Sequence, residues 1–339
     1  MEPYLSFVVA ARNDNYGGDF LQRIQLYVDV LFRWCGKYQL DSELVVVEWN
    51  PPSERPPLRE AVRWPGAGWP RVRIVQVPQE MHRSYPNSDK MPMFEYIAKN
   101  VGLRRARGRF CLSMNPDTLV SESLVRFFSK KRFSEGSYYR VDRYDVDPSL
   151  LRVPPEQLEP VCRSSWFRVH RRDGSFSRSE DRLRPLRKLL RPLLHPRGML
   201  SDVRQSFARA GKPSARMAKA HGNASGDFFL MSAGQWEALC GFPELTTHSH
   251  IDSTLCLLAA AKLRQVILPY PLYHQEHSRA EHAQRPLTDL QSIQQNVRVV
   301  LEKGGGRSLD LDGTSGNWGL PAARLEEWVV PAREGTSCR

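Results

Sequence analysis

Short apolar runs alternate with helical stretches through the first third of the chain, and this alternation restricts the fold more than any other feature. Four runs predict buried strands, at 5–11, 43–49, 72–77 and 109–114. Apolar side chains at helical spacing predict one helix from residue 19 to about residue 36 and a second over 91–105. This order of elements favours an α/β fold with an open, mixed, mainly parallel sheet flanked by helices.

The rest of the chain predicts the completion of one domain, interrupted by an insertion. Further elements are expected at 121–129, 138–146, 227–231, 232–240, 251–263, 265–268 and 289–303. No regular pattern is visible between about 147 and 223. We therefore divide the chain into a first half, a basic insertion, a second half and a loosely structured tail, at 1–160, 161–222, 223–303 and 304–339.

Composition excludes several classes of protein. Of the 339 residues, 41% are hydrophobic and 25% charged, which fits a globular protein rather than a mostly disordered one. No run approaches the ~18 apolar residues of a membrane-spanning helix, and the N-terminus lacks a signal-peptide pattern. The six cysteines are scattered without a C-x-x-C pair, which predicts reduced thiols in a cytoplasmic protein.

The net charge of +12 comes from one segment of the chain. Residues 163–219 hold 16 Lys and Arg side chains against four acidic ones, and the remaining residues hold 33 of each sign. Leucines alternate with arginines over 182–195, a pattern compatible with an interfacial helix at the inner face of an anionic membrane. The alternatives are a flexible or acceptor-covering insertion whose arginines reflect genomic composition, and contact with another anionic partner. The lack of a nucleic-acid-binding motif disfavours DNA and RNA.

Polar side chains lie at the ends of three predicted strands. The triplets are Arg12-Asn13-Asp14, Glu48-Trp49-Asn50 and Asn115-Pro116-Asp117. Ligands of open α/β sheets bind beyond the carboxyl ends of the strands. The glycine pattern of a dinucleotide site and the P-loop are both absent from the sequence. Acidic groups at several strand ends instead fit a ribose and a metal-bound diphosphate.

Several sequence blocks resemble GT-A-fold glycosyltransferases of the family-2-like group. Residues 7–14 resemble the first strand and nucleotide loop, and 43–50 resemble the second strand with its terminal acid. Residues 100–110 resemble the N-x-G-x-x-x-A-x-G segment before the D-x-D metal motif. An acceptor region that ends in an E-D motif resembles 226–230, Trp236, 241–244 and 251–252.

The resemblance implies a GT-A-like fold and a sugar transfer. The donor would be a UDP- or GDP-sugar, bound by the first half of the domain. The acceptor would be a hydroxyl of a glycan or lipid-linked molecule in surface polysaccharide or glycolipid synthesis, bound by the second half.

The resemblance also assigns roles to individual residues. Asp117 and His277 would bind Mn²⁺ or Mg²⁺, with His274 as the second choice of imidazole ligand. Asp252 would be the general base of an inverting displacement. Nucleotide-sugar contacts are expected from Arg12, Asp14, Glu48, Lys90 and Asn115, and acceptor contacts from Asp227, Trp236 and Glu244.

Two departures from the family pattern keep other functions open. Asn115 stands where the D-x-D motif has its first aspartate, and Ile251 where the E-D motif has its glutamate. A catalytically degenerate module that binds a membrane or a partner is therefore one alternative. A nucleotidyltransferase is another, although the first loop lacks the Gly-rich basic signature of such enzymes.

Overall fold

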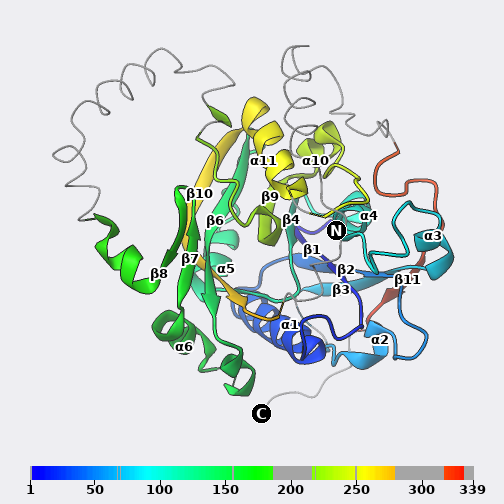
Figure 1. Ribbon diagram of the computed structural model, residues 1–339, viewed down its shortest axis with the longest axis horizontal. Helices are drawn as coiled ribbons and strands as arrows, with labels where there is room; N and C mark the ends of the chain where they lie inside the picture. Colours follow the sequence, from blue (N-terminus) through cyan, green and yellow to red (C-terminus); the bar gives the residue numbers. More distant parts are fainter. Residues whose placement is uncertain are drawn as a thin grey trace.

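The computed structural model shows one large sheet with helices on both faces (Figure 1). It describes residues 2–66, 68, 70–154, 156–185, 216–217, 219–248, 250–278 and 317–331.

The strands are β1 (Leu5–Ala11), β2 (Ser42–Trp49), β3 (Arg71–Val77), β4 (Phe110–Met114), β5 (Thr118–Val120), β6 (Ser137–Val146), β7 (Arg168–Arg171), β8 (Gly174–Ser177), β9 (Phe228–Ser232), β10 (Arg264–Gln275) and β11 (Glu326–Val329). The helices are α1 (Phe20–Lys37), α2 (Leu58–Ala61), α3 (Gln79–Arg83), α4 (Glu95–Arg105), α5 (Glu122–Phe128), α6 (Leu158–Ser165), α10 (Ala233–Leu239) and α11 (Ile251–Lys262), with 3₁₀ turns η1 (Pro148–Arg152) and η2 (Ser225–Asp227).

The sheet is mixed, and its longest ladders are parallel. Its strands lie in the order β11-β3-β2-β1-β4-β9-β6-β10-β5, and β7 and β8 extend it from β6. The four strands in the order β3-β2-β1-β4 pair in parallel with one another, and β6 pairs in parallel with β10, whereas β9 runs antiparallel between β4 and β6. The predicted open, mixed, mainly parallel sheet flanked by helices is confirmed.

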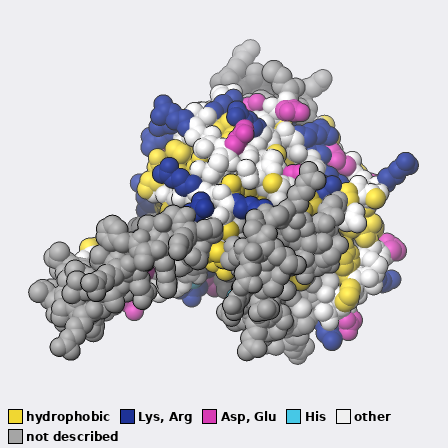
Figure 2. Space-filling model, turned by 90° about the horizontal axis from the view of Figure 1, so that it is seen from above, with side chains coloured by type: hydrophobic (Ala, Val, Ile, Leu, Met, Phe, Trp, Pro, Cys, Tyr) yellow, Lys and Arg dark blue, Asp and Glu magenta, His cyan; other side chains and the backbone are white. Residues whose placement is uncertain are grey.

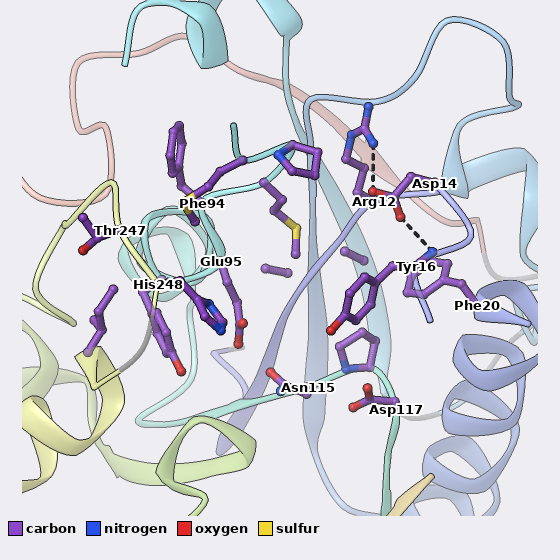
Figure 3. A pocket seen from close by; sticks show the side chains of 18 of the residues that line it. Arg12, Asp14, Tyr16, Phe20, Phe94, Glu95, Asn115, Asp117, Thr247 and His248 are labelled. Atoms are coloured by element: carbon purple, nitrogen blue, oxygen red, sulfur yellow. Dashed lines mark hydrogen bonds and ion pairs between the residues drawn. The ribbon is translucent and has the colours of Figure 1, made fainter. Parts of the chain in front are cut away.

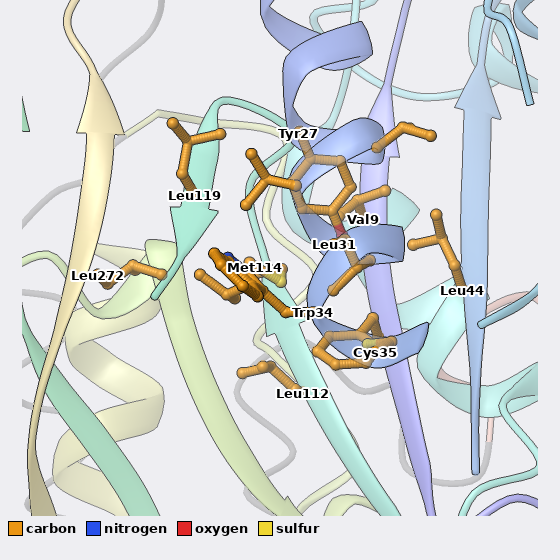
Figure 4. Packing of buried hydrophobic residues seen from close by; sticks show 14 of the residues in the cluster. Val9, Tyr27, Leu31, Trp34, Cys35, Leu44, Leu112, Met114, Leu119 and Leu272 are labelled. Carbon is orange, nitrogen blue, oxygen red and sulfur yellow. The ribbon is translucent and has the colours of Figure 1, made fainter. Parts of the chain in front are cut away.

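Each face of the sheet has its own hydrophobic core. Side chains alternate along β1, so Val9 packs toward α1 and Val8 toward α4. On the α1 side, Figure 4 shows Tyr27 and Leu31 against the strands. The parallel strands are apolar on both faces because both faces are covered, as the continuous apolar runs predict.

Gly102 sets the distance between α4 and the sheet. A Cβ at this position would lie 2.5 Å from Cγ1 of Val8 and 2.9 Å from Cγ2 of Val47. Only a glycine therefore lets α4 pack this closely on β1 and β2. The close packing also brings Lys99, one turn earlier on α4, beside the end of β4.

Two predicted elements differ in length from those observed. The helix expected from residue 91 begins at Glu95, because the preceding segment runs along the end of β2, where Nδ2 of Asn50 donates to the Pro92 carbonyl at 2.9 Å. The strand expected at 265–268 is β10, which continues to Gln275 past two prolines. A shift of register between Leu268 and Leu272 accommodates those prolines beside β6.

The prediction of a loosely structured tail is wrong for residues 317–331. Trp318 is buried, and β11 adds to the sheet antiparallel to β3. The guanidinium of Arg105 donates to the carbonyls of Gly319 and Leu320 and fixes the segment to α4. The sequence does not indicate this ordered segment, because one buried tryptophan and a four-residue strand produce no recognisable apolar periodicity. The helix predicted at 289–303 lies outside the described residues.

The basic insertion begins inside the fold. Its strands β7 and β8 extend the sheet from β6. Arg168 and Arg171 form ion pairs with Asp145 and Asp142, so part of its positive charge is neutralised within the protein. On the face seen in Figure 2, Lys and Arg side chains are spread among other residues rather than gathered in one patch. Residues 186–215, with most of the leucine–arginine pattern, lie outside the described residues.

The sequence predicts neither a membrane-spanning helix nor a disulfide. None of the helices in the described part of the chain is long and apolar enough to cross a bilayer. No disulfide joins the five cysteines of the described residues, and four of them are buried, so the prediction of reduced thiols is confirmed for these five.

Candidate active site

A pocket lies beyond the carboxyl ends of β1 and β4, with an empty volume of about 850 Å³ (Figure 3). These strands are parallel neighbours, so the polar loops that follow them meet at one edge of the sheet. The segment before α4 and the loop before α11 form the other walls. The lining residues include Arg12, Asp14, Tyr16, Phe20, Met91, Met93, Phe94, Glu95, Tyr96, Asn115, Pro116, Asp117, Leu245, Thr247, His248 and Ile251.

Arg12 and Asp14 form the wall of the pocket next to β1. Nη1 of Arg12 lies 2.8 Å from Oδ2 of Asp14, and its Nε donates to the Asn50 carbonyl at 2.6 Å. Oδ1 of Asp14 accepts a hydrogen bond from the Tyr16 amide at 3.1 Å. The structure thus places these two predicted residues together and fixes the guanidinium in one orientation at the pocket wall.

Asn115 is held from both sides by residues of other elements. Its Oδ1 accepts a hydrogen bond from Nζ of Lys99 at 2.5 Å, and its Nδ2 donates to Oδ1 of Asp227 at 2.8 Å. The fully buried Lys99 also donates to Oε1 of Glu95 at 2.6 Å and to the Gly226 carbonyl at 2.9 Å. Sequence reasoning missed Lys99; the only local signal was its i,i+4 spacing from Glu95.

Asp117 forms a cluster with two histidines. Its Oδ2 lies 3.1 Å from Nε2 of His277 and 3.8 Å from Nε2 of His274. One ligand atom from each of these three residues lies within 4.8 Å of the others. Strand pairing causes the approach, because β10 runs beside β5 and the Gln275 amide donates to the Asp117 carbonyl at 2.9 Å. Both predicted histidines therefore reach the predicted metal carboxylate.

The surroundings of Asp117 favour its ionised form. Burial by itself would raise the pKa of the carboxyl group. The hydrogen bond with His277 and the electrostatic influence of His274, His277 and Arg23 outweigh burial and hold the pKa well below its ordinary value. Oδ1 of Asp117 is buried and has no hydrogen-bond partner among the described residues. A charged, partly unpaired carboxylate is therefore available at the edge of the pocket.

A second buried carboxylate supports this cluster from β6. Asp145 is fully buried, and its carboxylate lies 3.2 Å from Nδ1 of His274, 2.8 Å from Nε2 of His170 and 3.0 Å from Nη2 of Arg143. Arg143 in turn pairs with Asp227 at 2.5 Å. Sequence reasoning missed Asp145 and Arg143, because the strand pattern of β6 gives no sign that its buried face carries charges.

Glu48 and Lys90 do not line this pocket. Glu48 is fully buried, and its Oε1 accepts a hydrogen bond from the Leu58 amide at 2.8 Å. Burial raises the pKa of Glu48 to about 7, although the Leu58 amide opposes this. Lys90 is exposed on the loop before α4. The structure does not bring these two residues together with the other predicted donor contacts.

Three residues of the expected acceptor region make contacts with the fold itself. Oδ2 of Asp252 accepts hydrogen bonds from the Ser225 hydroxyl at 2.9 Å and the Gly226 amide at 2.8 Å. Trp236 is buried in the α4-side core. Oε1 of Glu244 accepts hydrogen bonds from Asn100 and from the amide of Gly319. Asp252, Trp236 and Glu244 are not among the residues that line the pocket.

The site is thus a carboxylate–histidine cluster at the edge of a pocket in an open, mixed α/β fold. Among solved structures, the chain is similar to the mannosyltransferase PcManGT from Pyrobaculum calidifontis in complex with GDP-Man and Mn²⁺, with 14% identity, a TM-score of 0.42 and coverage of 95% of this chain and 73% of that chain. It is similar to S. aureus TarS 1-349 in complex with UDP-GlcNAc, with 13% identity, a TM-score of 0.42 and coverage of 88% and 66%. It is also similar to mannosyl-3-phosphoglycerate synthase from Rubrobacter xylanophilus, with 10% identity, a TM-score of 0.37 and coverage of 96% and 87%.

No protein-family model matches the chain, and no curated protein matches it. At these identities and TM-scores, likeness to solved structures assigns no activity to the chain. Its function has to be inferred from its own side chains.

Proposed function

We propose that the protein is a glycosyltransferase that moves a sugar from a UDP- or GDP-sugar to a hydroxyl acceptor, with inversion at the anomeric carbon. The observation that carries this proposal is the position of Asp117. It follows β4, lies in the wall of the pocket and contacts His277, which comes from β10 and its continuation. A carboxylate–imidazole cluster beside a pocket at the carboxyl edge of the sheet suits a metal-bound diphosphate.

The residues present fit a divalent cation. Asp117 offers a buried oxygen that has no partner among the described residues, and His274 and His277 offer imidazole nitrogens. Mg²⁺ prefers oxygen ligands, whereas imidazole nitrogens suit transition metals, so this donor set favours Mn²⁺. When bound, the cation would neutralise the charge that develops on the leaving diphosphate.

The side chains of the pocket account for donor binding. The guanidinium of Arg12 supplies a fixed positive charge for phosphate oxygens, because Asp14 and the Asn50 carbonyl hold its orientation. The aromatic side chains Tyr16, Phe94 and Tyr96 offer flat apolar surface for the base or the sugar ring. The loop before α11 forms the remaining side of the pocket.

The acceptor and the site of action are part of the same proposal. A glycan or a lipid-linked glycan supplies the hydroxyl group, and the basic segment at 163–219 contacts an anionic membrane that carries the acceptor. The support for this part is the charge of that segment and the exposure of Phe167 and Leu183 within it.

The experiment is turnover of a panel of UDP- and GDP-sugars with and without Mn²⁺, followed by release of the nucleoside diphosphate. We expect release from at least one donor, with Mn²⁺ more effective than Mg²⁺. We expect Asp117→Ala to abolish the release. Asp173→Ala, a substitution at an exposed aspartate of the β7–β8 turn, is the matched control and should leave release unchanged. Failure of every donor to bind or react would refute the proposal.

A further inference from the structure

Among the described residues, three carboxylates line the pocket: Asp14, Glu95 and Asp117. Both oxygens of Asp14 are occupied, one by Arg12 and the other by the Tyr16 amide. Asp117 contacts His277 and belongs to the proposed metal site. Among the described residues, Glu95 is therefore the one pocket carboxylate that neither pairs with Arg12 nor belongs to the proposed metal site.

The surroundings of Glu95 present one of its oxygens to the pocket. Glu95 is the first residue of α4, and its Oε1 accepts the hydrogen bond from the buried Lys99 at 2.6 Å. No described residue bonds to Oε2. In Figure 3 the side chain extends into the pocket in the direction of Asn115. Lys99 thus fixes the carboxylate through one oxygen and leaves the other for a ligand.

The expected base is engaged elsewhere. Oδ2 of Asp252 accepts two hydrogen bonds, from Ser225 and Gly226, which join α11 to η2. The neighbouring Ile251, which does line the pocket, is apolar. At the place where the family pattern has two acids, this chain thus presents an isoleucine to the pocket and an aspartate to its own backbone.

We propose that Glu95 is the general base of this protein. This inference rests on the proposed glycosyl transfer. Oε2 of Glu95 accepts the proton of the acceptor hydroxyl while that oxygen forms a bond to the anomeric carbon. The bond between the anomeric carbon and the diphosphate oxygen breaks, and its electron pair leaves with the nucleoside diphosphate. Glu95 then releases the proton to solvent.

The test compares Glu95→Gln with Glu135→Gln, a matched control at an exposed glutamate paired with Arg109. The substrate is a nucleotide-sugar that the wild type hydrolyses or transfers in the presence of Mn²⁺. A lost general base lowers kcat by about 100-fold or more. We expect this loss in Glu95→Gln, together with unchanged affinity for the nucleoside diphosphate. Glu95→Asp should retain part of the turnover, because it keeps a carboxylate at this position.

Three results would overturn the assignment. Turnover by Glu95→Gln within about fivefold of the wild type would exclude a base at this position. A loss of nucleotide affinity in proportion to the loss of turnover would make Glu95 a donor ligand instead. A loss of about 100-fold or more in kcat in His248→Asn, with turnover retained in Glu95→Gln, would move the role to His248. A wild type that turns over no donor would instead refute the proposed glycosyl transfer, and the role of Glu95 with it.

Discussion

Nζ of Lys99 donates a hydrogen bond to Oδ1 of Asn115 at 2.5 Å, while Nδ2 of the same asparagine donates to Asp227. An amide can accept on one side and donate on the other, whereas a carboxylate can only accept. This arrangement gives a physical reason for the asparagine at the first position of the D-x-D-like motif. Through these two hydrogen bonds, Asn115 links the end of β4 to α4 and η2.

Asn115→Asp is expected to destabilise the protein although it creates the D-x-D pattern of the family that the sequence resembles. The new carboxylate would lie next to that of Asp227 and replace a hydrogen bond with like-charge repulsion, which the ion pair with Lys99 offsets only in part. We expect the free energy of unfolding at pH 7 to fall by about 1–3 kcal/mol. The loss should shrink as pH falls and one carboxylate takes up a proton. Urea denaturation at two pH values measures this, and a variant as stable as the wild type would contradict the account.

Lys99→Met removes the donor on which this arrangement depends. Asn115 and the Gly226 carbonyl each lose a hydrogen bond inside the protein, and Glu95 loses its ion pair. We expect a loss of about 2–4 kcal/mol in the free energy of unfolding. Lys130→Met, at an exposed position beyond α5, is the control and should change it by less than about 0.5 kcal/mol. Equal stability of the two variants would show that Lys99 is not required.

Glu48→Gln should change how stability depends on pH. The pKa of Glu48 is raised to about 7 in the folded protein, above its ordinary value of 4.5. Between pH 4.5 and about 7, the carboxyl group of Glu48 therefore holds a proton in the folded state that it releases in the unfolded state. The contribution of Glu48 to the free energy of unfolding is lost as pH rises through this range. The full shift corresponds to about 3 kcal/mol.

We therefore expect Glu48→Gln to gain stability relative to the wild type at pH 8 and to show little difference at pH 4. Thermal or urea unfolding across this range measures the effect. If the difference between variant and wild type is the same at both pH values, Glu48 does not titrate as burial implies.

The membrane proposal for the basic segment predicts an effect of charge at 187–191. Arg187, Lys188 and Arg191 lie in the leucine–arginine pattern, so their joint replacement by glutamine should reduce co-flotation with vesicles that contain anionic lipid. The control replaces three exposed arginines of the body, Arg55, Arg63 and Arg132. Equal flotation of both triple variants would contradict a membrane role for this segment.

The central strands and helices could be predicted because their signal is local. Runs such as 5–11 and 43–49 are buried on both faces, and continuous apolar sequence indicates this directly. Strands β5, β7, β8 and β11 have only three or four residues each and depend on pairing with a longer neighbour. No window of the sequence carries such a signal.

The site could be predicted only where a motif marks it. Asp117 and His277 were found from the order of family-like blocks, and the structure places them in contact. Lys99 and Asp145 were missed, because the contacts that each makes join elements that are distant in the sequence. In the sequence alone, both residues look like ordinary surface charges. Asp252 shows the reverse case, since a motif match does not reveal that its carboxylate is bonded to the backbone of Gly226.

Calorimetric titration of a nucleotide-sugar, with and without Mn²⁺, measures whether donor binding depends on a metal at Asp117. The donor should be one of the UDP- or GDP-sugars that the protein turns over. We expect removal of Mn²⁺, or Asp117→Ala in its presence, to weaken binding by at least about tenfold, because either change would remove the cation that neutralises the diphosphate. Binding of equal affinity in all three titrations would contradict a metal-dependent donor site at Asp117.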